Sequence, residues 1–280
     1  MYGVPALFCG DLFHKPENMD QDLYTMWKDF YEDMRWGAFQ RFYLISGNHG
    51  IKHISKVGEK PVSWESLICD GNIFNCLDYN HFCIDMINNI EVYGVPYIDH
   101  NIGLNKYLKD LDLVGDKNIL LLHTDYPGAQ DTDGRVVDSV ENLNMNILNK
   151  FDLVLCGHIH KPQRLGKKVY MIGAPIQQRR TDRDCEMGFW KLYSDLSMEF
   201  EPFYEFPKFI DVASEDEIKD DGNYYTVIPQ KASIKEVVNH KITKQLSKKK
   251  LAHRYMRVKG IKDKAKESLL IEILKKSEEC

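Results

Sequence analysis

The chain has 280 residues, of which 43% are hydrophobic and 11% aromatic, enough for one domain with a large core and a small appendage. It shows no secretory signal sequence and no apolar run long enough to span a bilayer, so we expect neither secretion nor membrane attachment. The net charge of −5 is modest and does not by itself exclude any class of partner.

The charge is unevenly distributed along the chain. Residues 208–280 contain 17 Lys and Arg against 12 Asp and Glu, while residues 1–207 contain 20 against 30. Bound divalent cations would offset so acidic a body. The basic C-terminal part is expected to meet phosphate or an acidic partner, or to form a solvated helix face, and these interpretations stay open.

The cysteines indicate a reducing compartment. Their number, seven, is odd and they show no paired spacing, which is typical of the cytosol. Cys69, Cys76 and Cys83 are equally spaced but lack the short C-x₂-C pairs of a zinc site, so we expect ordinary packing for them.

Short apolar runs that end at glycine or at polar residues predict buried strands. These strands are expected at residues 4–9, 42–46, 73–74, 82–84, 92–95, 118–122, 152–156, 169–172 and 189–193. Helical spacing of apolar residues predicts a helix at 18–36, with Asn18 as its N-cap, and a helix is also expected at 138–149. Residues 51–70, which contain Gly58 and Pro61, are expected to be irregular.

The body is expected to end near Pro207, so we divide the chain into a domain at 1–207 and an appendage at 208–280. Within the appendage, residues 211–222 predict a polar loop and 224–229 a strand. Ser233 and Glu236 form a capping box that predicts a helix at 233–250. A final amphipathic helix is expected at 264–276.

Four short motifs stand where predicted strands run into loops. They read Gly10-Asp11-Leu12-Phe13-His14, Gly47-Asn48-His49, Leu122-His123-Thr124 and Gly157-His158-Ile159-His160. Side chains beyond strand ends are the usual ligands in layered α/β folds. Carboxylate, amide oxygen and imidazole suit Mn²⁺, Fe or Zn²⁺, and a carboxylate with several histidines can hold two cations about 3.5–4 Å apart for phosphate ester cleavage.

In this order the motifs resemble the calcineurin-like metallophosphoesterase superfamily, over roughly residues 4–205. The run from Gly10 to Pro16, the stretch 172–178 and Gly188-Phe189-Trp190 resemble its DNA repair branch, which holds the SbcD-type nuclease and the nuclease subunit of phage recombination endonucleases. The resemblance implies an α/β metallophosphoesterase sandwich of two mixed sheets flanked by helices. The first strand is expected to be missing here, and a small C-terminal α+β appendage follows.

The resemblance also implies the metal ligands. The implied ligands are Asp11, Asn48, His123, His158 and His160. Asp11 would bridge two cations, one of which also binds Asn48, His123 and His158, while His160 binds the other. We expect Mn²⁺, with Mg²⁺, Fe or Zn²⁺ as alternatives.

Further roles follow from the same resemblance. His49 would protonate the leaving oxygen, and the alternative is a histidine that only orients a ligand. His14 would position the phosphodiester unless it caps a helix. A loop expected near the site carries three arginines, Arg179, Arg180 and Arg183. These arginines are expected to contact phosphate in DNA, and an equal alternative is that they face neighbouring acids in solvent.

The chain departs from the family pattern at two places. Gly50 stands where the family usually has an acidic residue, which is not a direct ligand, so we expect a tuning effect. Nine residues precede Gly10 and contain no Asp-x-His motif, so of the family's two metal sites one is complete here. A truncated product, an exon-like fragment and a start set too late all stay open.

The expected function is that of a metal-dependent DNA nuclease subunit of a recombination and repair complex, in which metal-bound hydroxide attacks the phosphodiester. The implied partners are DNA and an SbcC-type coiled-coil ATPase docked on the appendage, and a homodimer is a further candidate assembly. The expected location is the cytoplasm of a bacterium or of a phage-infected host. The alternatives are a weakly active, N-terminally truncated scaffold for the ATPase, and a phosphatase or phosphodiesterase of the same superfamily.

Overall fold

The computed structural model describes residues 4–13, 21–36, 39–53 and 57–228. The predictions for His14, for Asn18 and for the helices at 233–250 and 264–276 lie outside these residues. The chain divides into two compact units, one formed by residues 1–210 with 219–225 and the other by residues 211–218 with 226–280. The domain boundary at 207 and 208 stays a prediction.

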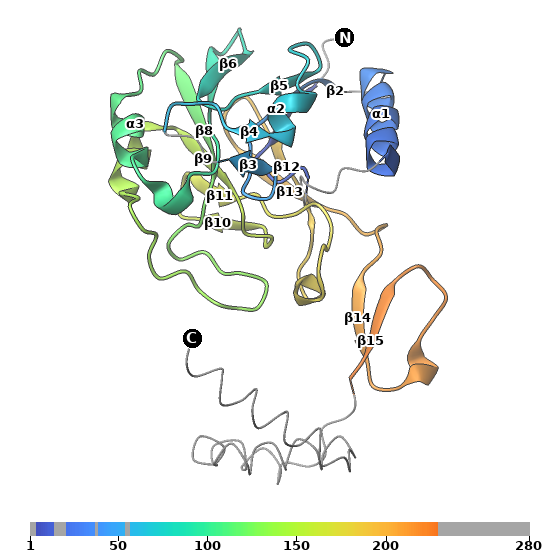
Figure 1. The fold of residues 1–280 in the computed structure, drawn as a ribbon. Helices are drawn as coiled ribbons and strands as arrows, with labels where there is room; N and C mark the ends of the chain where they lie inside the picture. Colours follow the sequence, from blue (N-terminus) through green and yellow to red (C-terminus); the bar gives the residue numbers. More distant parts are fainter. Residues whose placement is uncertain (1–3, 14–20, 37–38, 54–56, 229–280) are drawn as a thin grey trace, which may run out of the picture. The chain divides into compact units, whose positions relative to one another are not determined.

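Within the described residues, the first unit contains a smaller and a larger sheet (Figure 1). The smaller has the strand order β1-β2-β5, paired in parallel, with β1 at Val4–Phe8, β2 at Phe39–Leu44 and β5 at Phe74–Cys76. The larger has the order β10-β11-β9-β8-β7-β6. Its strands are β6 (Asn80–Asp85), β7 (Ile90–Val95), β8 (Lys117–His123), β9 (Leu153–Gly157), β10 (Gln163–Leu165) and β11 (Val169–Met171).

The larger sheet is mixed. Its central strands β7, β8, β9 and β11 are parallel, and the outer strands β6 and β10 pair antiparallel to their neighbours. The central strands are nearly continuous apolar runs, as expected for strands covered on both faces. The carboxyl ends of the parallel strands therefore meet at one edge of the sheet.

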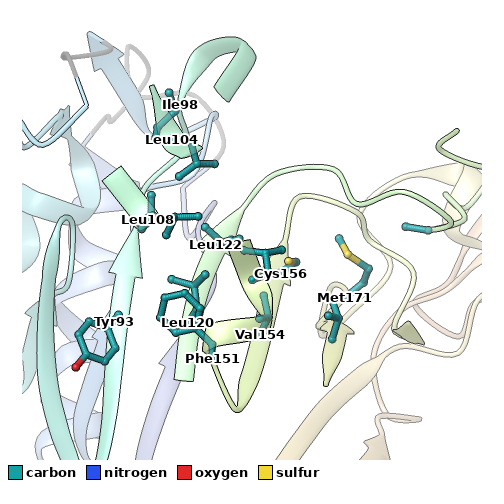
Figure 2. Packing of buried hydrophobic residues seen from close by; sticks show 14 of the residues in the cluster. Tyr93, Ile98, Leu104, Leu108, Leu120, Leu122, Phe151, Val154, Cys156 and Met171 are labelled. Carbon is teal, nitrogen blue, oxygen red and sulfur yellow. The ribbon is translucent and has the colours of Figure 1, made fainter. Parts of the chain in front are cut away.

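Alternation along β8 gives the sheet two apolar faces. Ile119 and Leu121 belong to an inner core that also contains Tyr43 and Ile45 around β2, so this core lies between the two sheets. Leu120 and Leu122 belong to an outer core that includes α3 (Leu104–Asp110). Figure 2 shows Leu120 and Leu122 together with Leu104, Leu108 and Tyr93 in this outer core.

The helix α1 (Gln21–Trp36) covers the smaller sheet. Trp27 and Phe30 pack on Phe42 and Phe74, with the Trp27 and Phe74 ring centroids 4.8 Å apart. The layers are thus α1, the smaller sheet, the inner core, the larger sheet and α3. The prediction of a layered α/β sandwich is confirmed.

The segment 51–70, predicted to be irregular, contains three short elements. These are β3 (Ile51–His53), β4 (Val62–Ser63) and α2 (Trp64–Ile68), with β3 and β4 paired antiparallel. The helix forms because Ser63 and Ser66 make a reciprocal capping box, in which the Ser66 N–H donates to Ser63 Oγ over 3.0 Å.

The helix predicted at 138–149 is wrong over its first seven residues. Residues 138–144 form no helix, and a 3₁₀ helix, η3, follows at Met145–Lys150. Hydrogen bonds of asparagine side chains tie residues 142–144 to residues 100 and 105, and these bonds replace those of an α-helix. Asn142 Nδ2 donates to the His100 carbonyl over 2.9 Å, and Asn105 Oδ1 accepts from Asn144 N over 2.7 Å.

The remaining described elements are short. The hairpin of β12 (Gly188–Leu192) and β13 (Met198–Pro202) adds Trp190 and Leu192 to the inner core. The strands β14 (Phe209–Val212) and β15 (Tyr224–Val227) pair with each other. Three further 3₁₀ helices are η2 (Asp99–Asn101), η4 (Arg180–Asp182) and η5 (Glu215–Glu217). Part of the loop predicted at 211–222 is therefore ordered as the end of β14 and as η5.

Across the part of the chain that the structure describes, none of the helices combines the length and the apolar character needed to cross a membrane.

Candidate metal centre

Four predicted ligands meet beyond the carboxyl ends of strands from both sheets. Asp11 follows β1 and Asn48 follows β2 of the smaller sheet, whereas His123 ends β8 and His158 follows β9 of the larger sheet. His123 continues the alternation of Ile119 and Leu121, so its ring faces the smaller sheet. The parallel pairing of His123 with Gly157 then places His158 next to it.

The ligand atoms of these four side chains are close together. His123 Nε2 lies 2.9 Å from Asn48 Oδ1, 3.1 Å from Asp11 Oδ2 and 3.3 Å from His158 Nδ1. His158 Nδ1 lies 3.0 Å from Asn48 Oδ1. The ligand atoms of Asp11, His123 and His158 all lie within 4.8 Å of one another. These distances bring four of the five predicted metal ligands to one point.

The protonation of this group fits a cation. His123 Nδ1 lies 2.6 Å from the Cys9 carbonyl oxygen, which can only accept, so Nδ1 carries a proton and Nε2 is the ring nitrogen that can offer a lone pair to a cation. That lone pair faces the oxygens of Asp11 and Asn48 and a nitrogen of His158. A proton can join only one such pair at a time, whereas a divalent cation binds all four atoms.

The pKa shifts of Asp11 and His158 also favour metal binding. Burial acts to raise the pKa of the Asp11 carboxyl, but the hydrogen bond and charge of His123 and the His49 N–H outweigh it, so the pKa is lowered. Burial lowers the pKa of His158, and neighbouring His123 lowers it further. An ionised Asp11 and a neutral His158 are the forms that bind metal.

The backbone is strained where it presents these side chains. Asp11 and His158 have φ values of 57° and 85°, in a region of the backbone dihedral angles that residues other than glycine rarely adopt. Gly10, at φ 95°, must be glycine for a second reason, because a Cβ there would collide with His123 Nδ1. The Gly-Asp motif thus allows the imidazole and the carboxylate to approach.

His49 lies next to this group. Its backbone N–H donates to Asp11 Oδ1 over 2.8 Å, which ties the loop after β2 to the loop after β1, and the residue is exposed. Its imidazole is near enough to contribute to the lowered pKa of Asp11. The general-acid role of His49 stays a prediction, and His14 lies outside the described residues.

His160 lies outside the four-atom group and has its own partner. Its Nδ1 lies 3.0 Å from Asp182 Oδ2, so an Nδ1–H donates to that carboxylate and leaves Nε2 available as a ligand. Asp182 is fully buried and also accepts from the N–H groups of Gln178 and Arg179, over 3.0 and 3.2 Å. Burial opposes the charge of Asp182, yet its hydrogen bonds lower its pKa to about 2.

Sequence reasoning did not single out Asp182, which is one of the acids that neighbour the arginine loop in the chain. No spacing in the chain indicates its pairing with His160, because the two are 22 positions apart and meet only through the fold. The same contact places the arginine loop beside His160. Arg179 Nε lies 3.4 Å from Asp182 Oδ1, and Arg183 Nε lies 3.6 Å from Asp184 Oδ2, so Arg179 and Arg183 do contact acids.

Two further residues border the group. Tyr97 follows β7 and stacks on His158, with ring centroids 6.4 Å apart and an interplanar angle of 24°. Its N–H donates to the Ser46 carbonyl over 2.8 Å, close to Asn48 in the chain. Sequence reasoning missed Tyr97, although its place after a strand parallel to β8 was a usable signal. Asp125 Oδ1 lies 3.7 Å from His158 Nε2, too long for a hydrogen bond.

Residues 4–162 match the family model described as calcineurin-like phosphoesterase. The match covers more than half of the chain, so the chain belongs to the calcineurin-like phosphoesterase family. This membership implies metal-dependent hydrolysis of phosphoesters, and the group of Asp11, His123 and His158 is the candidate site for the divalent metal. Comparison with curated proteins gives no match.

Proposed function

We propose that this chain is a metal-dependent DNA nuclease subunit of a recombination and repair complex, which hydrolyses phosphodiester bonds. The observation that carries the hydrolytic part is the convergence of Asp11, Asn48, His123 and His158 on one point from two sheets. Mn²⁺ is the proposed metal, because the set mixes carboxylate and amide oxygens with imidazole.

The residues around the metal have distinct proposed tasks. A bound divalent cation supplies Lewis-acid chemistry toward water and the phosphoryl group. Asp11 and Asn48 contribute oxygen ligands and fix the two loops that follow β1 and β2. The exposed imidazole of His49 stands beside Asp11 and gives its proton to the leaving oxygen.

The choice of DNA as substrate rests on the likeness of residues 10–16, 172–178 and 188–190 to DNA repair nucleases. The arginine loop supports it, because Asp182 joins this loop to His160. Arginines there would bind the phosphates on either side of the scissile bond. A weakly active scaffold is the second candidate, because in the described part of the chain His160 stands apart from the four-ligand group.

A cleavage assay with Mn²⁺ tests the proposal. The full chain should cut linear DNA, and His49→Ala should lower the rate by on the order of 10²–10⁴, the usual contribution of a positioned general acid. Mn²⁺ binding should be unchanged by this substitution. His81→Ala is the matched control, because His81 pairs with Glu91 on the larger sheet.

Each outcome of that assay decides something. Cleavage of a small phosphomonoester but not of DNA would favour a phosphatase. Mn²⁺ binding without any cleavage would favour the scaffold. A His49→Ala variant that cuts DNA at the wild-type rate would show that His49 is not the acid.

For the C-terminal appendage we propose a contact with a coiled-coil ATPase of SbcC type. The support is the amphipathic pattern at 264–276, whose apolar residues Leu269, Leu270, Ile273 and Leu274 need a surface to cover, together with the basic balance after residue 207. Replacing Leu270 and Ile273 by Asp should abolish recovery of the partner in a pull-down, because contact energy concentrates in a few apolar residues.

Lys266→Asp is the control for that pull-down, because it also adds an acid but at a polar position. Mn²⁺ binding should be retained in both variants. Wild-type recovery of the partner by the double variant would contradict the docking proposal. Unfolding of the double variant would instead assign the helix to the chain's own core.

A further inference from the structure

The carboxyl group of Glu65 occupies the space in which a side chain at residue 50 would lie. A Cβ added to Gly50 would collide with both carboxyl oxygens of Glu65. Gly50 directly follows Asn48 and His49, so Glu65 lies against the loop that carries a candidate ligand and the candidate acid. Gly50 is therefore required by a side chain from elsewhere in the chain, not by a turn.

Pairing between β3 and β4 places Glu65 there. Ile51 pairs with Ser63, and the Trp64 N–H donates to the Gly50 carbonyl over 3.2 Å. Ser63 then caps α2, which turns the chain so that Glu65, the second residue of this helix, faces the loop. The chain thus leaves the site after Gly50, runs through the segment 51–70, and brings the acidic side chain of Glu65 back beside Gly50.

The surroundings of Glu65 are unusual for a structural acid. The residue is 0% exposed, and among the described residues neither of its carboxyl oxygens has a hydrogen-bond partner. Burial raises the pKa of Glu65 to about 8, and the nearby charges of Asp11 and Asp78 add to the rise. A buried acid without partners destabilises the fold, so its presence calls for an explanation beyond packing.

The amide of Leu12 also faces this carboxyl group without completing a hydrogen bond. Leu12 follows Asp11 in the loop after β1, and Gly50 ends the loop after β2. Glu65 therefore stands between the two loops that provide the oxygen ligands of the candidate metal centre.

We propose that Glu65 is a positioning residue of the metal centre, in which its carboxyl group takes the place of the side chain that Gly50 lacks and holds the Asn48 loop against the Asp11 loop. The proposal rests on the proposed function, because it takes Asp11 and Asn48 as metal ligands. Gly50 and Glu65 act as one unit, so the carboxyl group can be moved from one residue to the other.

Other hydrogen bonds already hold this part of the chain in place. Ser46 Oγ contacts both Ser63 Oγ and Asp78 Oδ2, and the Ser46 N–H donates to Asp78 Oδ1 over 2.8 Å. These bonds already fasten the end of β2 to the start of α2. Glu65→Gln, which keeps the shape of the side chain and replaces the carboxyl group with an amide, should therefore fold.

Calorimetric titration of the full, metal-free chain with Mn²⁺ tests the proposal. Glu65→Gln and Glu65→Ala should weaken the affinity by roughly 10–100-fold, the usual effect of removing a group that orients a metal ligand. Gly50→Glu alone should also weaken it, because the two carboxyl groups would compete for one space. The double variant Gly50→Glu, Glu65→Gly should recover most of the loss, since it returns one carboxyl group to that space.

Glu59→Gln is the control, because Glu59 is an exposed acid of the same segment. Wild-type affinity in Glu65→Gln would overturn the inference, and so would a double variant no better than Gly50→Glu alone. Loss of folding in Glu65→Gln, seen by circular dichroism, would also overturn it and leave a purely structural role. A wild-type chain that binds no Mn²⁺ would overturn the metal centre itself, and this inference with it.

Discussion

Two buried carboxyl groups border the candidate metal centre, and their environments push their pKa values in opposite directions. Asp182 accepts hydrogen bonds from His160 and from two backbone N–H groups, so its charged form is favoured and its pKa falls to about 2. The Glu65 carboxyl oxygens have no hydrogen-bond partner among the residues that the structure describes, and the pKa of Glu65 rises to about 8. Burial raises the pKa of both groups, but at Asp182 the hydrogen bonds and the charge of His160 outweigh it, whereas at Glu65 the charges of Asp11 and Asp78 add to it.

The lowered pKa of Asp182 predicts an acid-dependent loss of stability. Its folded pKa of about 2 lies below the unfolded value of about 3.9, so its contribution is complete above the unfolded value and is lost as the pH falls toward 2. Urea denaturation of the metal-free chain should show Asp182→Asn less stable than wild type at pH 6, with the difference shrinking below about pH 4. A difference that is independent of pH would contradict this account.

Among single residues, sequence could indicate those that stand in local motifs. Asp11, Asn48, His123 and His158 each follow an apolar run, and the structure brings them together. The residues that support them could not be found in this way. Asp182 and Glu65 reach the site through the fold, and their neighbours in sequence suggest only exposed loop acids.

At the scale of elements, the length of a segment decided what sequence could predict. The strands β8 and β9 were predicted because each contains a run of four apolar residues, which is stable only when it is buried. The elements β3, β4 and α2 have two to five residues and are held by capping and pairing, which leave almost no apolar period. The helix prediction at 138–149 failed because hydrogen bonds of asparagine side chains to distant parts of the chain replace the helical bonds.

These short elements matter more to the site than their size suggests. The backbone bond from Trp64 to Gly50 fixes where the chain returns to the Asn48 loop. The capped first turn of α2 then determines that the side chain of Glu65 faces this loop. A segment that sequence could only describe as irregular thus carries the residue that fills the space beside Gly50.

At the scale of the molecule, the candidate metal centre lies between the two sheets. Asp11 and Asn48 come from the smaller sheet, and His123 and His158 come from the larger one. The inner core joins the same sheets through apolar contacts that include Tyr43. A cation at the strand ends would add a second junction, so metal binding and the docking of the sheets should be coupled.

This coupling predicts that Mn²⁺ stabilises the chain. One tight equivalent should bind, because four ligands meet at one point while His160 stands apart. A cation present at 100 times its Kd adds about 2.7 kcal/mol, which corresponds to a rise in Tm on the order of 5–10 °C for a domain of this size. Differential scanning calorimetry with Mn²⁺ and with EDTA measures the shift. Asn48→Ala should reduce it and His81→Ala should not, because only Asn48 lies at the junction. Tight binding of two equivalents of Mn²⁺ per chain would contradict a single metal that joins the sheets. A wild-type Tm that does not change with Mn²⁺ would also contradict it.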